Sequence, residues 1–202
     1  MNPYQVVKDF ESALCEYTGA PYAVSVNSCT SALLLCLDHF KCAGLNPWTS
    51  IEIPSKTYVS VPMQILNVGW RVRFREEDWR GSYRLYPTPI WDCARRFTSG
   101  MYVAGQFQCV SFHWSKILGI QQGGAILHDD ADADAIFRRM RFDGRTEGVE
   151  PRHDTFPIRG WHAYMAPEIA AEGLVRLSLL PQHNEDLPNS DYPDLSEVAL
   201  FQ

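Results

Sequence analysis

A lysine and an aspartate that follow predicted strands are the residues of this sequence best placed to take part in a reaction. Lys116 comes four residues after Phe112, which closes a predicted buried strand, and it is one of only four lysines in the chain. An amine at the mouth of an α/β sheet can form a Schiff base when its surroundings lower its pKa. Asp92 closes another apolar segment and could pair with a cationic ring nitrogen. The alternatives are a solvated loop lysine and an aspartate that caps a helix.

Two further features add hydroxyl groups and backbone amides. Ser28, Cys29 and Thr30 lie between a predicted strand and a predicted helix. Free N–H groups at a helix start, with hydroxyls beside them, form a phosphate site. The alternative is an ordinary N-cap by Ser28 or Thr30. The pair Gly123-Gly124 permits either a plain tight turn or the close approach of another backbone segment.

The segments that must position these groups alternate between helix and strand. Apolar residues spaced at i, i+3, i+4 and i+7 predict helices, and short alternating or apolar runs predict strands. The predicted helices cover residues 6–17, 32–40, 60–68, 129–142 and 167–180, and the predicted strands cover residues 22–26, 51–53, 70–74, 89–91, 107–112 and 124–128. This order predicts an α/β fold, a three-layer sandwich with a mostly parallel sheet, whose ligands lie at the carboxyl ends of the strands.

Together, the amine, the acid and the hydroxyl-rich turn are the groups needed to hold pyridoxal phosphate (PLP). Lys116 would carry the Schiff base with the cofactor aldehyde. Asp92 would keep the pyridine nitrogen protonated, so that the ring accepts electrons from the substrate α-carbon. The phosphate would lie against residues 28–31, with help from Ser111.

Several segments also carry a family pattern, and the most specific is a Ser-Phe-x-x-x-Lys hallmark followed by Gly-Gly-Ala. The matching segments are Glu16-Tyr17-Thr18-Gly19-Ala20-Pro21-Tyr22-Ala23-Val24, Ser28-Cys29-Thr30-Ser31-Ala32-Leu33, Pro54-Ser55-Lys56-Thr57-Tyr58, Trp91-Asp92-Cys93-Ala94-Arg95, Ser111-Phe112-His113-Trp114-Ser115-Lys116, Gly123-Gly124-Ala125 and Arg139-Met140-Arg141. With these segments, the chain resembles the DegT/DnrJ/StrS-type sugar aminotransferases, PLP enzymes of fold type I, from its first helix to about residue 180.

The resemblance implies an activity and a set of site residues. The enzyme would move an amino group from an amino-acid donor, commonly glutamate, to a keto group, typically of a nucleotide-linked sugar. Its catalytic residues would be Lys116, which also shuttles the proton, and Asp92. The implied cofactor-binding residues are Ser28, Cys29, Thr30, Tyr58, Asp92, Arg95, Ser111, Lys116 and His162. Tyr58 would stack on the cofactor ring, and the active site would be shared across a homodimer interface.

Some positions depart from the family pattern. Cys29 replaces a glycine, Arg95 replaces a Gln or His, and His162 replaces an Asn that reaches the partner's phosphate. An Arg at position 95 would bring a fixed positive charge and could bind a substrate carboxylate. The family's C-terminal small domain has no counterpart in this sequence. The alternatives are therefore a PLP-dependent decarboxylase or lyase acting on an amino-acid-like substrate, or a non-catalytic cofactor-binding relic.

Composition and charge limit the other possibilities. The chain has 202 residues, 46% hydrophobic and 21% charged, which suits a globular protein and excludes a disordered, collagen-like or coiled-coil chain. A net charge of −6 makes nucleic acid an unexpected partner. No apolar run approaches the roughly 20 residues of a membrane span, and no signal-peptide core is present, so we expect a cytoplasmic protein. The six cysteines lack metal-ligand spacing, so no metal site is expected.

Charge also marks a boundary near the C-terminus. Residues 1–180 are predicted to form the PLP-binding large domain, and residues 181–202 an acidic C-terminal arm. The arm carries five acidic residues and no Lys or Arg. Its apolar side chains could anchor it on a partner protomer: Leu195, Val198, Leu200 and Phe201. The alternative is a disordered, solvated segment.

Overall fold

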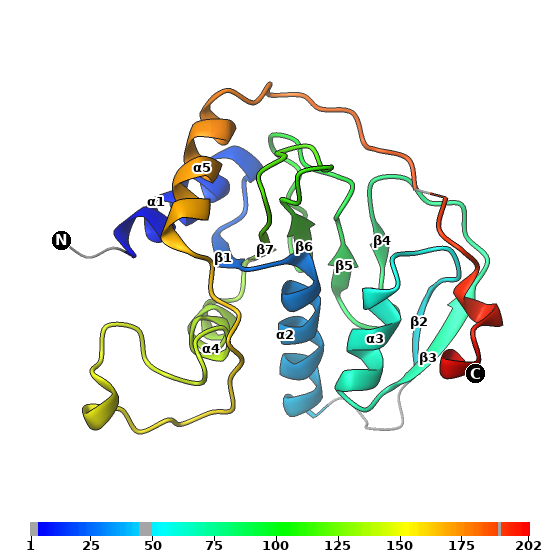
Figure 1. The fold of residues 1–202 in the computed structure, drawn as a ribbon, viewed down its shortest axis with the longest axis horizontal. Coiled ribbons are helices and arrows are strands. Elements are labelled where there is room, and N and C mark those ends of the chain that lie inside the picture. The colour runs from blue at the N-terminus through cyan, green and yellow to red at the C-terminus, as the bar shows by residue number, and fades with distance from the viewer. Residues whose placement is uncertain (1–3, 45–49, 190) are drawn as a thin grey trace.

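The computed structural model describes residues 4–44, 50–189 and 191–202, and helices alternate with strands along the chain (Figure 1). The helices are α1 (Gln5–Thr18), α2 (Cys29–Cys42), α3 (Ser60–Asn67), α4 (Ala131–Met140) and α5 (Pro167–Ser178). The strands are β1 (Tyr22–Val26), β2 (Ser50–Pro54), β3 (Arg71–Arg75), β4 (Tyr83–Arg84), β5 (Ile90–Asp92), β6 (Phe107–Ser111) and β7 (Gly124–His128). Short 3₁₀ helices cover Pro151–His153, Leu195–Glu197 and Ala199–Phe201. Every predicted helix and strand is present, and β4 is the one described strand that was not predicted.

Five strands form the central sheet in the order β1-β7-β6-β5-β4, and β2 and β3 form a separate parallel pair. Among the described strands of the central sheet, only β5 and β6 run parallel, because the β1–β7, β6–β7 and β4–β5 pairs are antiparallel. The mostly parallel sheet expected from the sequence is therefore a mixed sheet. The short connection between β4 and β5 accounts for one of the antiparallel pairs, because parallel neighbours need a long crossover. No helix separates β4 from β5 or β6 from β7.

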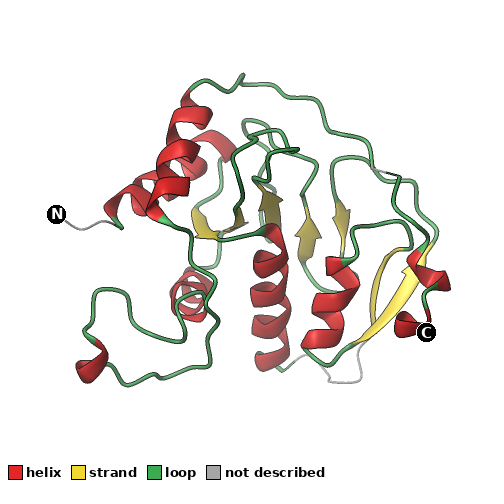
Figure 2. Cartoon of the chain, viewed as in Figure 1, coloured by secondary structure: helices red, strands yellow, loops and turns green. Residues whose placement is uncertain are grey.

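Helices pack on both faces of the central sheet, which gives the predicted three layers (Figure 2). Side chains of a strand point alternately to its two faces. On β7, Ile126 packs into the core shared with α2, α3 and α4, whereas Ala125 and Leu127 pack into the core shared with α1 and α5. The α/β layer architecture predicted from the sequence is thus confirmed, and each helix contributes apolar side chains to one of the two cores.

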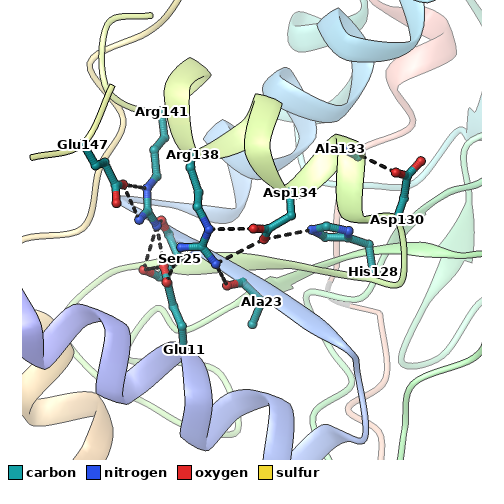
Figure 3. Close-up of polar contacts among 10 residues, drawn as sticks. All are labelled: Glu11, Ala23, Ser25, His128, Asp130, Ala133, Asp134, Arg138, Arg141 and Glu147. Carbon is teal, nitrogen blue, oxygen red and sulfur yellow. Dashed lines mark hydrogen bonds and ion pairs between the residues drawn. The ribbon is translucent and has the colours of Figure 1, made fainter. Parts of the chain in front are cut away.

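A buried polar network ties α1 and α4 to the edge strand β1 (Figure 3). Glu11 is only 4% exposed, and its Oε1 accepts the N–H of Ser25 at 2.9 Å and the Ser25 hydroxyl at 2.7 Å. The same carboxylate pairs with Arg138 at 2.6 Å and with Arg141. Burial alone would raise the pKa of Glu11, but the charges of Arg141 and Arg138 outweigh burial and hold that pKa below its usual value.

The chain after α5 crosses the molecule and ends beside β2 and β3 (Figure 1). We call residues 182–189 and 191–202 the C-terminal strap. Asp186 pairs with Arg96 at 2.6 Å, and the N–H of Leu195 donates to the carbonyl of Ser55 at 2.9 Å. Leu195 is buried. The described part of this acidic segment therefore packs on its own chain.

The apolar side chains of the strap do not all act as anchors. Leu195 and Phe201 are buried, and the ring of Phe201 meets the ring of Phe74 on β3 with a centroid distance of 6.0 Å. Val198 and Leu200 are exposed. The structure thus gives two of the four expected anchors a partner within the same protomer.

Neither a membrane helix nor a metal cluster occurs in the described part of the chain. None of its helices combines the length and the apolar character needed to cross a bilayer. No group of three or more His, Cys, Asp or Glu side chains is arranged to hold a metal ion there.

Replacing Glu11 by Ala should destabilise the fold strongly. Removing Glu11 takes the buried carboxylate away from Arg138 and Arg141 and leaves Arg141 with the partly exposed Glu147 alone, so the free energy of unfolding near neutral pH should fall by about 3–5 kcal/mol. Urea unfolding measures this change. Glu16→Ala, at an exposed position of the same helix, is the control and should change the free energy by less than about 0.5 kcal/mol.

The pH dependence of the Glu11→Ala effect follows from the lowered pKa of Glu11. A carboxyl with a folded-state pKa below its unfolded value stabilises the protein above the unfolded pKa, and the stabilisation is lost as pH falls through the folded pKa. The difference between wild type and variant should therefore shrink below about pH 4. A difference of equal size at neutral and acidic pH would contradict this role for the carboxylate.

Candidate active site

A cavity of about 360 Å³ lies where β5 and β6 end and α2 begins. Eight of the nine predicted site residues line it: Ser28, Cys29, Thr30, Tyr58, Asp92, Arg95, Ser111 and Lys116. Thr57, Ser60, Trp79 and Tyr192 also line the cavity. The remaining predicted residue, His162, lies elsewhere.

The hydroxyl-rich turn is fixed by a cap and by two glycines. Ser28 is the N-cap of α2, and its Oγ accepts the N–H of Ser31 at 3.1 Å. A β-bridge links Ser28 to Gly123. A Cβ on Gly124 would lie 2.5 Å from the backbone nitrogen of Cys29, so a larger residue would push the turn away from β7. The N-cap by Ser28 is thus confirmed, the phosphate site stays a prediction, and the glycine pair allows close approach as well as turning.

The next two residues of the turn, Cys29 and Thr30, also line the cavity. The Thr30 hydroxyl lies 2.9 Å from the hydroxyl of Ser60, the first residue of α3, so the starts of two helices present hydroxyls to the cavity. The Cys29 thiol fills the space that a glycine would leave, and its Sγ lies 3.5 Å from the carbonyl oxygen of Cys109. Burial raises the pKa of Cys29, so this thiol acts as a small neutral side chain.

Asp92 ends β5 and is only 4% exposed. Its Oδ1 accepts the N–H of Ala94 at 2.8 Å, and its Oδ2 accepts the hydroxyl of Tyr83 at 2.9 Å. Burial raises the pKa of Asp92, while these two donors and the charges of Lys116 and Arg95 oppose the rise. A turn follows Asp92 where the alternative interpretation expected a helix, so this carboxylate caps a turn and faces the cavity.

Lys116 lies in the loop that leads from β6 to β7. Ser111 ends β6 opposite Gly124 and also lines the cavity. The backbone N–H of Lys116 donates to the carbonyl of His113 at 2.8 Å, which closes a turn. The Lys116 charge lowers the pKa of Asp92, so the amine and the buried carboxylate interact across the cavity. The lysine is partly buried rather than a freely solvated loop residue.

Arg95 brings a second cation to the cavity. Its backbone is held on both sides, because its N–H donates to the carbonyl of Gly81 at 3.2 Å and its carbonyl accepts the N–H of Leu187 at 2.9 Å. Among the described residues, its buried Nε has no hydrogen-bond partner. Buried donors normally find an acceptor, so this nitrogen has a hydrogen bond to offer beside the cavity that Arg95 lines.

His162 is the predicted residue that this single chain does not bring to the cavity. Its side chain is 72% exposed, and its Nδ1 lies 2.9 Å from a carboxylate oxygen of Asp143. Its ring also meets the ring of Tyr164 at a centroid distance of 4.8 Å. The role implied for it lies across a subunit interface and stays a prediction.

The sequence did not reveal two tyrosines that border the site. Tyr83 is buried behind Asp92, and its strand β4 left little signal because it spans two residues before a proline-containing hairpin turn. Tyr192 comes from the C-terminal strap, and its ring lies 6.1 Å from the ring of Tyr58, which is 55% exposed. The sequence signal for Tyr192 was weak: an aromatic residue among prolines and acidic residues.

Comparison with known proteins places this geometry in context. The model of the DegT/DnrJ/EryC1/StrS aminotransferase family matches residues 1–85 and 98–186. GDP-perosamine synthase of Caulobacter vibrioides is 26% identical over 222 aligned residues, which cover 88% of this chain and 57% of that protein.

Solved structures show the same fold. AtS13 from Actinomadura melliaura superposes with a TM-score of 0.76 at 20% identity, over 86% of this chain and 59% of that one. GDP-4-keto-6-deoxymannose-3-dehydratase, solved with a trapped PLP-glutamate geminal diamine, gives a TM-score of 0.71 at 17% identity, over 88% and 61%. These likenesses confirm the predicted fold class.

The chain spans less than two thirds of the length of each of these proteins. Asp92 and Arg95 fall between the two matched parts of the family model, so their assignment rests on the cavity geometry. The two matched parts nevertheless cover most of the sequence, and the resemblance drawn from its motifs is confirmed. The chain belongs to the DegT/DnrJ/EryC1/StrS aminotransferase family.

Proposed function

We propose that this protein is a PLP-dependent aminotransferase, which moves an amino group from an amino-acid donor to a keto group. The observation that carries the proposal is one cavity lined by Lys116, Asp92 and the hydroxyl-bearing start of α2. The names of similar proteins, a GDP-perosamine synthase and a sugar-nucleotide dehydratase solved with PLP-glutamate, support it. They also favour a nucleotide-linked sugar as the keto acceptor.

The residues present fit PLP part by part. The amides at the start of the 14-residue helix α2, with the Ser28 and Thr30 hydroxyls, suit a phosphate. The buried Asp92 carboxylate suits a protonated ring nitrogen. Lys116 supplies the primary amine, and the unpaired Nε of Arg95 is a donor for a further anionic oxygen. When bound, PLP supplies an aldehyde that condenses with amines and a ring that accepts electrons.

In this proposal each side chain has a defined task. Lys116 would hold the cofactor through Nζ and would move the proton at the substrate α-carbon. Asp92 would orient the ring and keep its nitrogen protonated. Tyr58 would pack against the ring, and the turn at Ser28 would hold the phosphate. The short distance between turn and strand at Gly124 keeps this anchor rigid relative to Lys116.

The proposal includes a small-molecule amino donor, a keto acceptor and a homodimer with a shared active site in the cytoplasm. The position of His162 supports the dimer, because its exposed side chain lies outside the cavity of its own chain. In the dimer it would reach the cofactor of the partner subunit.

One observation favours a second candidate, a PLP-dependent decarboxylase or lyase. Arg95 places an unpaired guanidinium nitrogen in the cavity, where it could bind the carboxylate of an amino-acid-like substrate. Lys116 and Asp92 would keep the same tasks in that reaction. The two candidates differ in whether the amino group leaves the donor.

Lys116→Ala should abolish covalent PLP binding. Wild-type protein mixed with PLP should show a visible absorption band, and borohydride reduction followed by mass spectrometry should locate a pyridoxyl group on Lys116. The variant should show neither signal. Lys56→Ala, at an exposed residue outside the cavity lining, is the matched control. Retention of the band in Lys116→Ala, or its absence in the wild type, would overturn the cofactor assignment.

Glutamate should separate the two candidate reactions. For an aminotransferase, adding L-glutamate to the PLP-loaded protein should bleach the visible band and release one equivalent of 2-oxoglutarate per active site, since the amino group stays on the enzyme. Both signals can be followed in one anaerobic titration, with D-glutamate as the control. Release of carbon dioxide or ammonia from an amino acid, without 2-oxoglutarate from L-glutamate, would favour the second candidate.

A further inference from the structure

We propose that Tyr83 is a positioning residue for Asp92, and that Thr57 in turn holds Tyr83, so that two buried side chains fix one carboxylate at the cavity wall. The ligand-binding part of this inference rests on the proposed function. The contact between Tyr83 and Asp92 can be tested without any ligand.

Strand register brings the two side chains together. β4 pairs antiparallel with β5, and Tyr83 is the residue directly opposite Asp92. The Tyr83 hydroxyl donates to Oδ2 at 2.9 Å, while the Ala94 N–H donates to Oδ1 at 2.8 Å. Each carboxylate oxygen therefore has one donor from the protein and keeps a lone pair for a ligand.

The direction of the hydrogen bonds between these hydroxyls follows from the charge of Asp92. An ionised carboxylate can only accept, so the Tyr83 proton is used on Asp92. The Thr57 hydroxyl lies 2.6 Å from the Tyr83 oxygen, and it must then donate to that oxygen. Both side chains are 1% exposed, so water does not compete. Thr57 also lines the cavity, where its oxygen is left as an acceptor.

Packing leaves Tyr83 little freedom to turn away. The Trp79 ring meets the Tyr83 ring edge-on at a centroid distance of 4.7 Å, and the Trp79 indole N–H donates to the carbonyl of Lys56 at 2.9 Å. Lys56 precedes Thr57 in the chain. The hairpin that carries Tyr83 and the segment that carries Thr57 are thus fixed to each other beside the cavity.

The groups around Asp92 determine how much the Tyr83 hydroxyl contributes to the pKa of the carboxyl. Burial raises the pKa of Asp92, and the Ala94 N–H, the Tyr83 hydroxyl, Lys116 and Arg95 counter it in that order. The ionisable groups facing Asp92 from the surrounding elements are Cys29, Tyr83, Cys93, Arg95, Cys109 and Lys116. Burial keeps the three thiols neutral by raising their pKa values. Loss of the tyrosine hydroxyl therefore removes one of few groups that keep the carboxylate ionised.

The first experiment uses the protein without PLP and measures urea unfolding of wild type and Tyr83→Phe across pH. The fold favours protonated Asp92, so its contribution to stability falls as pH rises from the unfolded to the folded pKa. Tyr83→Phe should raise the folded pKa further. Its effect should be small where Asp92 is protonated in both proteins. At higher pH it should grow to about a tenfold change in the unfolding equilibrium constant, the value of one pKa unit.

Matched variants identify the partner of the hydroxyl. In an Asp92→Asn background, Tyr83→Phe should lose its pH dependence, because no titrating carboxylate remains. Thr57→Val should change the pH profile in the same direction as Tyr83→Phe, since it leaves the tyrosine oxygen without its donor. Tyr86→Phe, at an exposed tyrosine of the same hairpin, should match wild type. A pH-independent effect of Tyr83→Phe in the wild-type background would overturn the proposal.

The second experiment measures PLP affinity by the Lys116-dependent absorption band. Tyr83→Phe should weaken PLP binding about tenfold near neutral pH, consistent with the loss of one hydrogen bond to a charged group. Unchanged affinity at every pH would overturn the positioning role. If the wild type binds no PLP while the pH-dependent coupling is present, the proposed function fails and the Tyr83–Asp92 contact stands.

Discussion

A carboxylate buried at the end of β5 is the constraint on which the candidate site depends. Moving an ionised carboxylate out of water is unfavourable unless hydrogen bonds and opposite charges compensate. Here the compensation comes from four separate stretches of the chain: the turn after β5, the strand β4, the β6–β7 loop and the segment that carries Thr57. The antiparallel pairing of β4 with β5 brings Tyr83 directly opposite Asp92.

The sequence predicted the periodic elements well, because helices and strands leave local patterns. The stripe that predicted α1 and the apolar run that predicted β7 both depend on residues within one element. Strand direction was predicted less well, because the helix pattern does not decide it: no helix joins β5 to β6 or β6 to β7, yet the first pair is parallel and the second is antiparallel. The two-residue strand β4 was missed because it is too short to show a period.

In the candidate site too, residues with a local sequence pattern were predicted, and residues placed by contacts between distant segments were not. Lys116, Asp92 and Ser28 were found because each follows or precedes a recognisable strand, and the structure brings them to one cavity. Tyr83, Thr57 and Tyr192 could not be assigned, because their roles arise from pairing and packing between segments distant in sequence. The acidic strap shows this most clearly, since its composition alone did not reveal that the Asp186 carboxylate would meet Arg96.

The position of β1 has a consequence for how the protein is made. Among the described strands, β1 pairs only with β7. About a hundred residues separate the two partners, and such non-local pairing is slow to form. During synthesis the N-terminal part leaves the ribosome first. The turn at Ser28 has no sheet to rest on until Gly124 and the rest of β7 have emerged. A nascent chain arrested before β7 should therefore lack the close contact between the Ser28 turn and Gly124, even though it already contains Lys116 and Asp92.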